Sequence, residues 1–125
     1  MDSIVFDSIV IGGGHAGVEA SHALSSLGAK TLLLTLNLNR LGNMPCNPHI
    51  GGSAKGNVVR EIDALGGLMG QAADINPLQM KMLNTGKGPG VQCLRSQQDK
   101  EGYPKIIFSL LSKEKNLSLK QEEVN

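Results

Sequence analysis

The sequence predicts an α/β fold with a parallel sheet, and three consecutive segments near its amino-terminal end predict it. Residues 6–11 form a short apolar run that leads directly into a cluster of glycines, as a buried strand before a turn does. Residues 15–27 are mostly small or apolar at helical spacing, and residues 30–35 form a second apolar run. A strand, a helix and a strand within about thirty residues form a right-handed βαβ unit, so the two strands are expected to be parallel.

The helix at 15–27 is expected to face the sheet with small side chains, which let a helix lie close to a strand. Gly28 follows this helix and is a suitable terminator. The residues expected on the buried face are Ala16, Ala20, Ala23, Leu24 and Leu27.

The remaining residues predict further short elements within one domain of residues 1–125. Residues 37–56 are rich in Asn, Gly and Pro and are expected to be irregular. The expected elements are a helix at 57–65 with Val59, Ile62 and Leu65 inward, a strand at 75–83, a loop at 86–90, a helix within 98–115 that starts near Pro104, and a strand within 116–124. A sheet of this type usually has more strands, so the parallel sheet is expected to be incomplete.

Composition and charge argue against several classes of protein. The net charge of +1 gives no overall field that would draw the chain to nucleic acid or to a membrane. No apolar run approaches the roughly 20 residues that span a bilayer, and no signal peptide is expected before the first strand. The two cysteines form no C-x-x-C pair, which predicts reduced thiols and a cytoplasmic setting.

The glycine cluster matches the dinucleotide-binding motif G-x-G-x-x-G at Gly12, Gly14 and Gly17. The first glycine permits a tight turn, the second lets the backbone approach a pyrophosphate, and the third lets the helix pack closely on the strand. Free amides and the dipole at the start of the helix then bind the phosphates. A pyrophosphate is therefore expected on Gly12, Gly13, Gly14, His15, Ala16 and Gly17. A glycine-rich turn without a ligand is the alternative.

One part of the dinucleotide fingerprint is missing. The ribose usually meets an acidic residue about 20 residues after the motif, at the end of the second strand. No acid occurs between Ala20 and Asn39, but Thr35 and Asn37 stand at that point and can hydrogen-bond a hydroxyl without a charge. The motif alone therefore does not distinguish FAD from NAD.

Cys46 lies between two prolines, in Pro45-Cys46-Asn47-Pro48. A free thiol is mostly protonated at neutral pH, so a catalytic role for Cys46 requires positive surroundings. Lys55, Arg60 or the amides of the following helix could supply them. The alternative is an inert buried cysteine, because free cysteines are among the most buried residues.

Residues 81–105 have a positive charge excess of +3, which is suited either to RNA phosphate or to a solvated surface. The charged residues are Lys81, Lys87, Arg95, Lys100 and Lys105 against Asp99 and Glu101. The three histidines form no H-E-x-x-H motif and no cluster with cysteine, so no metal site is expected.

Five segments, in their order and spacing, form a combination that is more specific than the glycine turn alone. They are Val10–Ala20 with His15 after Gly14, Met44–Gly52, Glu61–Met69, Leu83–Pro89 and Leu94–Lys100. In these segments the chain resembles the amino-terminal part of the MnmG/GidA family, which are flavoenzymes that modify the wobble uridine of certain tRNAs.

The resemblance implies a Rossmann-like FAD-binding domain of the glutathione-reductase type. Residues 1–125 would be its amino-terminal part, without the NAD-binding insertion and the carboxy-terminal helical domain. It implies FAD on the glycine turn, a backbone contact from Val124 to the adenine, and a role for Cys46 in the chemistry on uracil. Lys55, Lys87 and Arg95 are candidate contacts to substrate or flavin.

The resemblance also implies a reductant and partners. NADH would supply hydride from a site outside this segment. The partners would be tRNA and a GTPase of the MnmE type, with the full-length protein as a homodimer within a heterotetramer.

Two alternatives stay open at this point. A folate- and FAD-dependent tRNA uridine methyltransferase would share the glycine turn, although it is not expected to carry the segment Pro48–Gly52. The chain alone could also be a non-catalytic truncated fragment that binds only a nucleotide. The chain departs from the family pattern at Gly86, Gly90 and Pro104, where the family usually has Ser, Ala and no proline.

Overall fold

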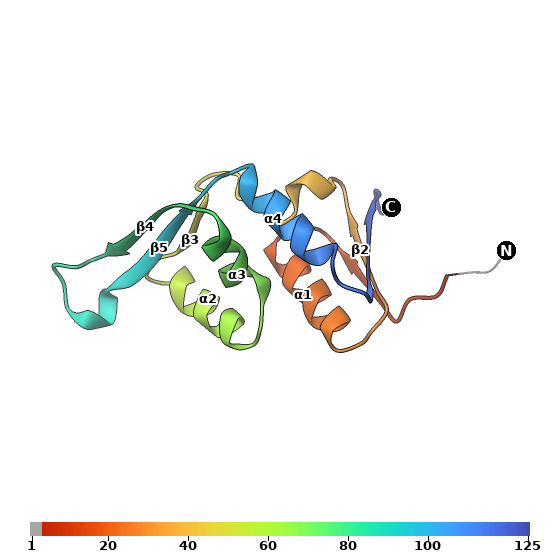
Figure 1. The fold of residues 1–125 in the computed structure, drawn as a ribbon, viewed down its shortest axis with the longest axis horizontal. Coiled ribbons are helices and arrows are strands. Elements are labelled where there is room, and N and C mark those ends of the chain that lie inside the picture. The colour runs from red at the N-terminus through yellow and green to blue at the C-terminus, as the bar shows by residue number, and fades with distance from the viewer. Residues whose placement is uncertain (1–3) are drawn as a thin grey trace.

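A sheet of three parallel strands forms one end of the molecule (Figure 1). The computed structural model describes residues 4–125. β1 (Ser8–Ile11) pairs with β2 (Thr31–Thr35), which pairs on its other side with β6 (Leu117–Gln121). α1 (His15–Ser26) connects β1 to β2. The predicted βαβ unit and the strand predicted near the carboxy-terminal end are therefore confirmed.

A second sheet of three antiparallel strands lies toward the other end (Figure 1). Its strand order is β3 (His49–Gly51), β5 (Cys93–Gln98) and β4 (Pro77–Leu83). β4 and β5 form a protruding hairpin, and its connection contains the short 3₁₀ helix η2 (Pro89–Val91). β4 confirms the strand predicted within 75–83.

Two elements lie inside the segment that was expected to be irregular, residues 37–56. They are β3 and the 3₁₀ helix η1 (Leu38–Arg40). β3 has three residues and pairs only with β5, which itself reads Cys-Leu-Arg-Ser-Gln-Gln and has no apolar pattern. Both strands form because backbone groups find partners across the sheet, and local sequence does not report such pairing.

Three further helices lie beside the second sheet and between it and the parallel sheet (Figure 1). α2 (Lys55–Ala64) and α4 (Gly102–Leu111) match the predicted helices, and Pro104 lies in the first turn of α4, as expected. α3 (Leu68–Ile75) was not predicted, because its eight residues are too few for a helical pattern to stand out. No helix in the described part of the chain has the length and apolar character needed to cross a bilayer.

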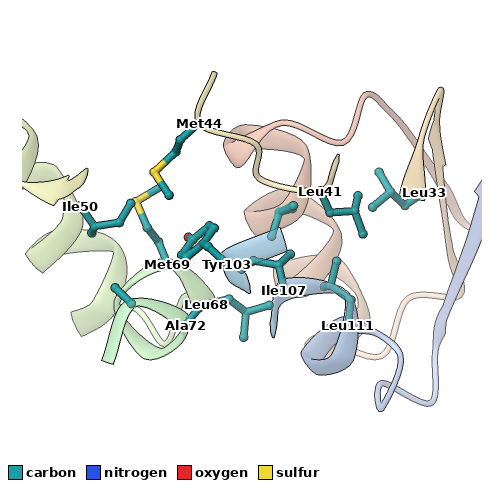
Figure 2. Packing of buried hydrophobic residues seen from close by; sticks show 12 residues of the cluster. Leu33, Leu41, Met44, Ile50, Leu68, Met69, Ala72, Tyr103, Ile107 and Leu111 are labelled. Atoms are coloured by element: carbon teal, nitrogen blue, oxygen red, sulfur yellow. The ribbon is translucent and has the colours of Figure 1, made fainter. Parts of the chain in front are cut away.

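α4 lies at the centre of the hydrophobic core (Figure 2). Tyr103, Ile107 and Leu111 recur at helical spacing along one face and are at most 1% exposed. They belong to one buried cluster with Leu33 of β2, Leu41, and Leu68, Met69 and Ala72 of α3. The core therefore joins the parallel sheet to the helices that support the second sheet.

α1 packs through a different face from the one predicted. Its buried residues are Val18, Ser21 and Ser25, whereas Leu27 is 85% exposed. Of the predicted inner residues, Ala16, Ala20 and Ala23 are exposed and Leu24 is half-buried. Serine can line this interface because it is small, and the Ser25 hydroxyl has two acceptors within reach, the His22 carbonyl and the Glu114 carboxylate. A prediction based on apolar side chains could not identify a buried face of this kind.

Two further burial predictions are wrong. Leu65 is 90% exposed, because it stands just after the end of α2 in the turn to α3, while Val59 and Ile62 are half-buried as expected. On β1, Ile9 and Ile11 are 58% and 65% exposed, although a buried strand was expected. β1 has one partner strand, and no element within residues 4–125 covers Ile9 and Ile11 on the face opposite Val10.

Candidate functional site

The glycine motif lies at the turn between β1 and α1. Gly12 has a φ of +109°, which side-chain-bearing residues rarely adopt, and its amide donates to the Leu34 carbonyl at 2.8 Å. A Cβ on Gly17 would overlap the carbonyl oxygen of Gly12. The first and third glycines of the motif are therefore required by the backbone and by the close approach of helix and strand.

Gly14, like Gly12, has open space where a Cβ would stand. A Cβ there would meet no atom within 4 Å, and Gly14 precedes the first residue of α1. The Val18 amide makes the first bond of the helix, to the Gly14 carbonyl, which leaves the amides of His15, Ala16 and Gly17 without a helical partner. Free amides at the positive end of a helix dipole are suited to phosphate, so these residues fit a pyrophosphate.

A pocket of about 410 Å³ adjoins this turn and brings predicted ribose-binding residues to it. Gly13, Gly14, Thr35 and Asn37 all line it, together with Arg40. The Asn37 Oδ1 accepts a hydrogen bond from the backbone amide of Asn39. The side-chain nitrogen of Asn37, Nδ2, has no hydrogen-bond partner among the described residues. Sequence reasoning missed Arg40, and the available signal was a cation five residues after the end of β2.

Val124 follows the end of β6, beside the last residue of β2. The Glu122 amide donates to the Thr35 carbonyl at 3.0 Å, which places the segment that contains Val124 at the same end of the sheet as the pocket. Val124 itself is 48% exposed. Its contact with adenine remains a prediction.

His15 opens α1 and packs on Tyr103 of the core. The two rings meet edge to face, with centroids 6.1 Å apart and planes at 63°. Burial lowers the pKa of His15, the nearby Lys55 ammonium lowers it further, and Glu19 raises it by less. Both burial and Lys55 therefore favour the neutral imidazole at the start of the helix.

Cys46 is exposed, in a loop that is tied down on both sides. Lys100 Nζ donates to the Pro45 carbonyl at 2.7 Å, and the Gln98 amide donates to the Pro48 carbonyl at 2.7 Å. Cys46 is therefore not buried, as the alternative required, and its role in the chemistry remains a prediction. Cys93 is the buried cysteine, with its Sγ 3.6 Å from Ser53 Oγ.

The three predicted contact residues lie in different places. Lys55 begins α2, and its Nζ donates to the His49 carbonyl at 3.0 Å, close enough to His15 to affect its pKa. Burial lowers the pKa of Lys55 itself. Arg95 is in β5, paired with Gly51 of β3. Lys87 lies in the connection of the β4–β5 hairpin, at the end of the molecule away from the glycine turn (Figure 1).

Arg60, the other predicted neighbour of Cys46, lines a separate pocket of about 360 Å³ between α2, α3 and the second sheet. Of Lys55, Arg60, Lys87 and Arg95, only Lys55 is shown close to the glycine turn, through its effect on His15. Within residues 4–125, no three His, Cys, Asp or Glu side chains come together as a metal site.

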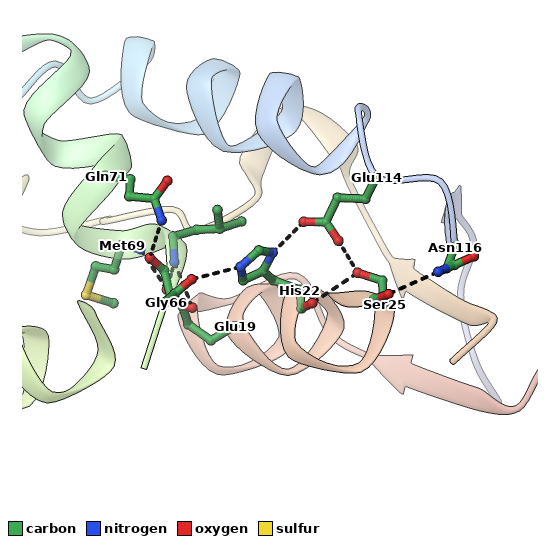
Figure 3. Close-up of polar contacts among 10 residues, drawn as sticks. Glu19, His22, Ser25, Gly66, Met69, Gln71, Glu114 and Asn116 are labelled. Atoms are coloured by element: carbon green, nitrogen blue, oxygen red, sulfur yellow. Dashed lines mark hydrogen bonds and ion pairs between the residues drawn. The ribbon is translucent and has the colours of Figure 1, made fainter. Parts of the chain in front are cut away.

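A polar network that sequence reasoning did not find holds α1 in place (Figure 3). The Glu19 carboxylate accepts hydrogen bonds from the Leu68 and Met69 amides at the start of α3. His22 contacts the Glu114 carboxylate through Nδ1 and the Gly66 carbonyl through Nε2. Glu114 also accepts a hydrogen bond from Ser25. No sequence motif marks these contacts, because their partners are 44 to 92 residues apart.

Comparison with known proteins covers nearly the whole chain but a small part of its relatives. The tRNA uridine 5-carboxymethylaminomethyl modification enzyme MnmG of Lactococcus lactis subsp. cremoris (strain MG1363) is 62% identical over 116 residues, which are 93% of this chain and 19% of that protein. The crystal structure of Aquifex aeolicus GidA matches with a TM-score of 0.91 and 54% identity, over 96% of this chain and 20% of that one.

A more distant structure shows the fold alone. PqsL from Pseudomonas aeruginosa, described as a probable FAD-dependent monooxygenase, matches with a TM-score of 0.56 at 11% identity, over 91% of this chain and 32% of that one. The predicted Rossmann-like α/β fold of FAD-binding domains is thereby confirmed. The family model of glucose inhibited division protein A (GidA) matches residues 7–125, and the chain belongs to this family.

Proposed function

We propose that the protein takes part in FAD-dependent modification of the wobble uridine of tRNA, in which a 5-carboxymethylaminomethyl group is formed. The observation that carries this proposal is the glycine turn. Gly17 must be glycine for α1 to approach Gly12, and Gly14 leaves open space beside three free amides. The name and 62% identity of the Lactococcus lactis relative support the substrate and the reaction.

In this proposal the turn binds the pyrophosphate of FAD. The amides of His15, Ala16 and Gly17 donate to phosphate oxygens, and the dipole of α1 favours their negative charge. Thr35 and Asn37 hydrogen-bond the ribose, and the backbone near Val124 contacts the adenine. FAD, when bound, supplies hydride-transfer chemistry that the protein's own side chains lack.

Cys46 is proposed as the nucleophile toward the uracil ring. Its exposure supports this role, because the thiol is open to a large substrate. As thiolate it adds to C6 of uracil, which makes C5 nucleophilic. C5 then attacks a one-carbon unit supplied by a methylene-folate and joined to glycine or ammonia. After C5 has lost its proton, the bond from sulfur to C6 breaks and the thiolate leaves.

The reductant and partners follow from family membership alone. We infer NADH as reductant, a GTPase of the MnmE type and tRNA as partners, a homodimer within a heterotetramer, and a cytoplasmic location. Because the chain spans 19% of the Lactococcus lactis protein, the activity of the whole relative is itself part of the proposal.

Flavin binding tests the cofactor site directly. The full-length protein, mixed with FAD and freed of unbound cofactor, is expected to keep a yellow flavin spectrum. Gly17→Ala is expected to lose it, because its methyl group collides with the Gly12 carbonyl. Gly86→Ala is the matched control, since a Cβ at Gly86 meets nothing within 4 Å. Equal flavin content in both variants would refute the assignment of the glycine turn.

Nucleoside analysis separates the alternatives. A folate-dependent methyltransferase would form 5-methyluridine, and a non-catalytic fragment would leave tRNA unchanged. The proposed function instead predicts a 5-carboxymethylaminomethyl group on the wobble uridine.

A further inference from the structure

A second polar pocket, of about 400 Å³, lies beside the dinucleotide pocket and contains three cations. Arg40, Lys100 and Lys105 line it, with Glu101 as the one carboxylate. All three cationic residues are exposed. Within residues 4–125, none of the three forms an ion pair with a carboxylate, and Glu101 offsets only one of the three charges in the pocket.

The core fixes the positions of these cations. Arg40 belongs to η1 and precedes Leu41, which is fully buried. Lys105 lies in the first turn of α4, two residues after Tyr103, which is 1% exposed. Leu41 and Tyr103 belong to the same buried cluster. The backbone is therefore held while the charged ends of both side chains stay in solvent.

The pocket also connects the two parts of the candidate site. It shares Asn37, Arg40 and Asn43 with the dinucleotide pocket. On its other side it includes Pro45, whose carbonyl accepts the hydrogen bond from Lys100 Nζ. Cys46 is the next residue, so an anion in this pocket would lie between the cofactor pocket and the exposed thiol.

We propose that the Arg40–Lys100–Lys105 pocket binds a backbone phosphate of the RNA substrate, next to the nucleotide that Cys46 receives. The inference rests on the proposed function. An excess of two positive charges in a concave site favours phosphate, and the guanidinium of Arg40 can donate two parallel hydrogen bonds to it. The pyrophosphate of the cofactor already has its donors in the glycine turn, so the pocket remains available to RNA.

Salt-dependent tRNA binding tests this pocket. The affinity of the protein for unmodified tRNA is measured by fluorescence anisotropy at several salt concentrations. Loss of one phosphate contact lowers the salt exponent by roughly 0.7–0.9, which corresponds to about a fivefold weaker affinity at 0.15 M salt. This loss is expected for Arg40→Gln and for Lys105→Gln. Lys113→Gln, an exposed lysine eight residues further on and outside the pocket, is the control and is expected to bind as the parent does.

The outcomes separate this inference from the proposed function. If both pocket variants keep the affinity and salt exponent of the control, the pocket does not bind RNA. If they lose bound flavin while tRNA affinity is unchanged, the pocket belongs to the cofactor and the inference is also wrong. In either case nucleoside analysis can still support the proposed function. If the parent protein binds flavin but shows no salt-dependent affinity for tRNA, both the RNA substrate and this pocket are refuted.

Discussion

The Glu19 carboxylate of α1 accepts a hydrogen bond of 2.7 Å from the backbone amide of Met69, in the first turn of α3. A second amide, that of Leu68, donates to the same carboxylate. Gly67 precedes them, and a Cβ there would lie 2.6 Å from Glu19 Oε2, so the approach needs a glycine. One carboxylate thus caps a helix that starts 49 residues later and joins it to α1.

Removing this cap is expected to destabilise the fold. Glu19→Ala should lower the free energy of unfolding by about 1–2 kcal/mol, because two helix amides lose their acceptor and a favourable charge at the helix start is lost. Glu19→Gln should cost less, since an amide oxygen can still accept. Urea denaturation measures both changes. Glu61→Ala, at an exposed position of α2, is the control, and an effect of equal size there would contradict the capping role.

His22 is expected to make stability depend on pH. Burial alone lowers the pKa of His22, but the hydrogen bonds to Glu114 and Gly66 and the charges of Glu114 and Glu19 outweigh burial and raise it. Both ring nitrogens face acceptors, which suits the imidazolium. A folded-state pKa above the unfolded value of about 6.5 stabilises the protein below pH 6.5, and this contribution is lost as pH rises through the folded pKa.

Urea denaturation of variants at two pH values isolates the contribution of His22 to stability. The pKa of His15 is lowered on folding, so His15 gives stability the opposite pH dependence from His22. Its contribution to stability is present at high pH and is lost as the pH falls. Denaturation of the parent therefore combines two trends. His22→Gln and Glu114→Gln are both expected to lose stability at pH 5.5 and much less at pH 8.5. A loss that is equal at both pH values would show that His22 is uncharged in its network.

The two cysteines are expected to differ sharply in reactivity. Cys46 is exposed, whereas Cys93 of β5 is buried beside Ser53. One thiol should react with a chromogenic disulfide reagent in the native protein, and the second only after denaturant is added. Cys46→Ala should abolish the fast reaction and keep the slow one. Fast reaction of two thiols in the native parent would contradict the burial of Cys93.

Gly86 and Gly90 depart from the family pattern, and replacing either glycine with alanine is expected to stabilise the protein. Neither Gly86 nor Gly90 has a positive φ, and a Cβ at either position meets nothing within 4 Å. Gly90→Ala should therefore raise the free energy of unfolding by about 0.4–1 kcal/mol, because alanine restricts the unfolded chain. Thermal denaturation checks this. Gly51→Ala is the contrasting variant, since Gly51 has a φ of +101° and a Cβ would collide with the Leu94 carbonyl. Equal effects would contradict the geometry of the second sheet.

The parts of the fold that could be predicted are those with local signals. β1, α1 and β2 follow from apolar runs around a glycine motif, and Pro104 marks the start of α4. α3 and β5 could not be predicted, because α3 depends on a distant carboxylate and β5 buries Ser96 and Gln98. Gln98 Nε2 is satisfied by the Ala73 carbonyl, a contact that exists only in the folded chain.

The candidate site was predictable in the same uneven way. Spacing alone placed the glycines, Thr35 and Asn37 together, and in the structure Gly13, Gly14, Thr35 and Asn37 line one pocket. Arg40 was not predicted as a site residue, because a single cation after a strand has no feature that distinguishes it from other surface residues. The basic segment 81–105 proved to be two groups, since Lys100 and Lys105 join Arg40 while Lys87 lies at the hairpin. Only tertiary packing determines which charges meet.

The most direct test of the central claim is mass-spectrometric nucleoside analysis of tRNA. Cells that lack the gene are expected to lose the 5-carboxymethylaminomethyl group on the wobble uridine, and the parent gene should restore it. The Cys46→Ala gene should produce protein with normal flavin content and fail to restore the modification. Undiminished modification in cells without the gene, or full restoration by Cys46→Ala, would contradict the account.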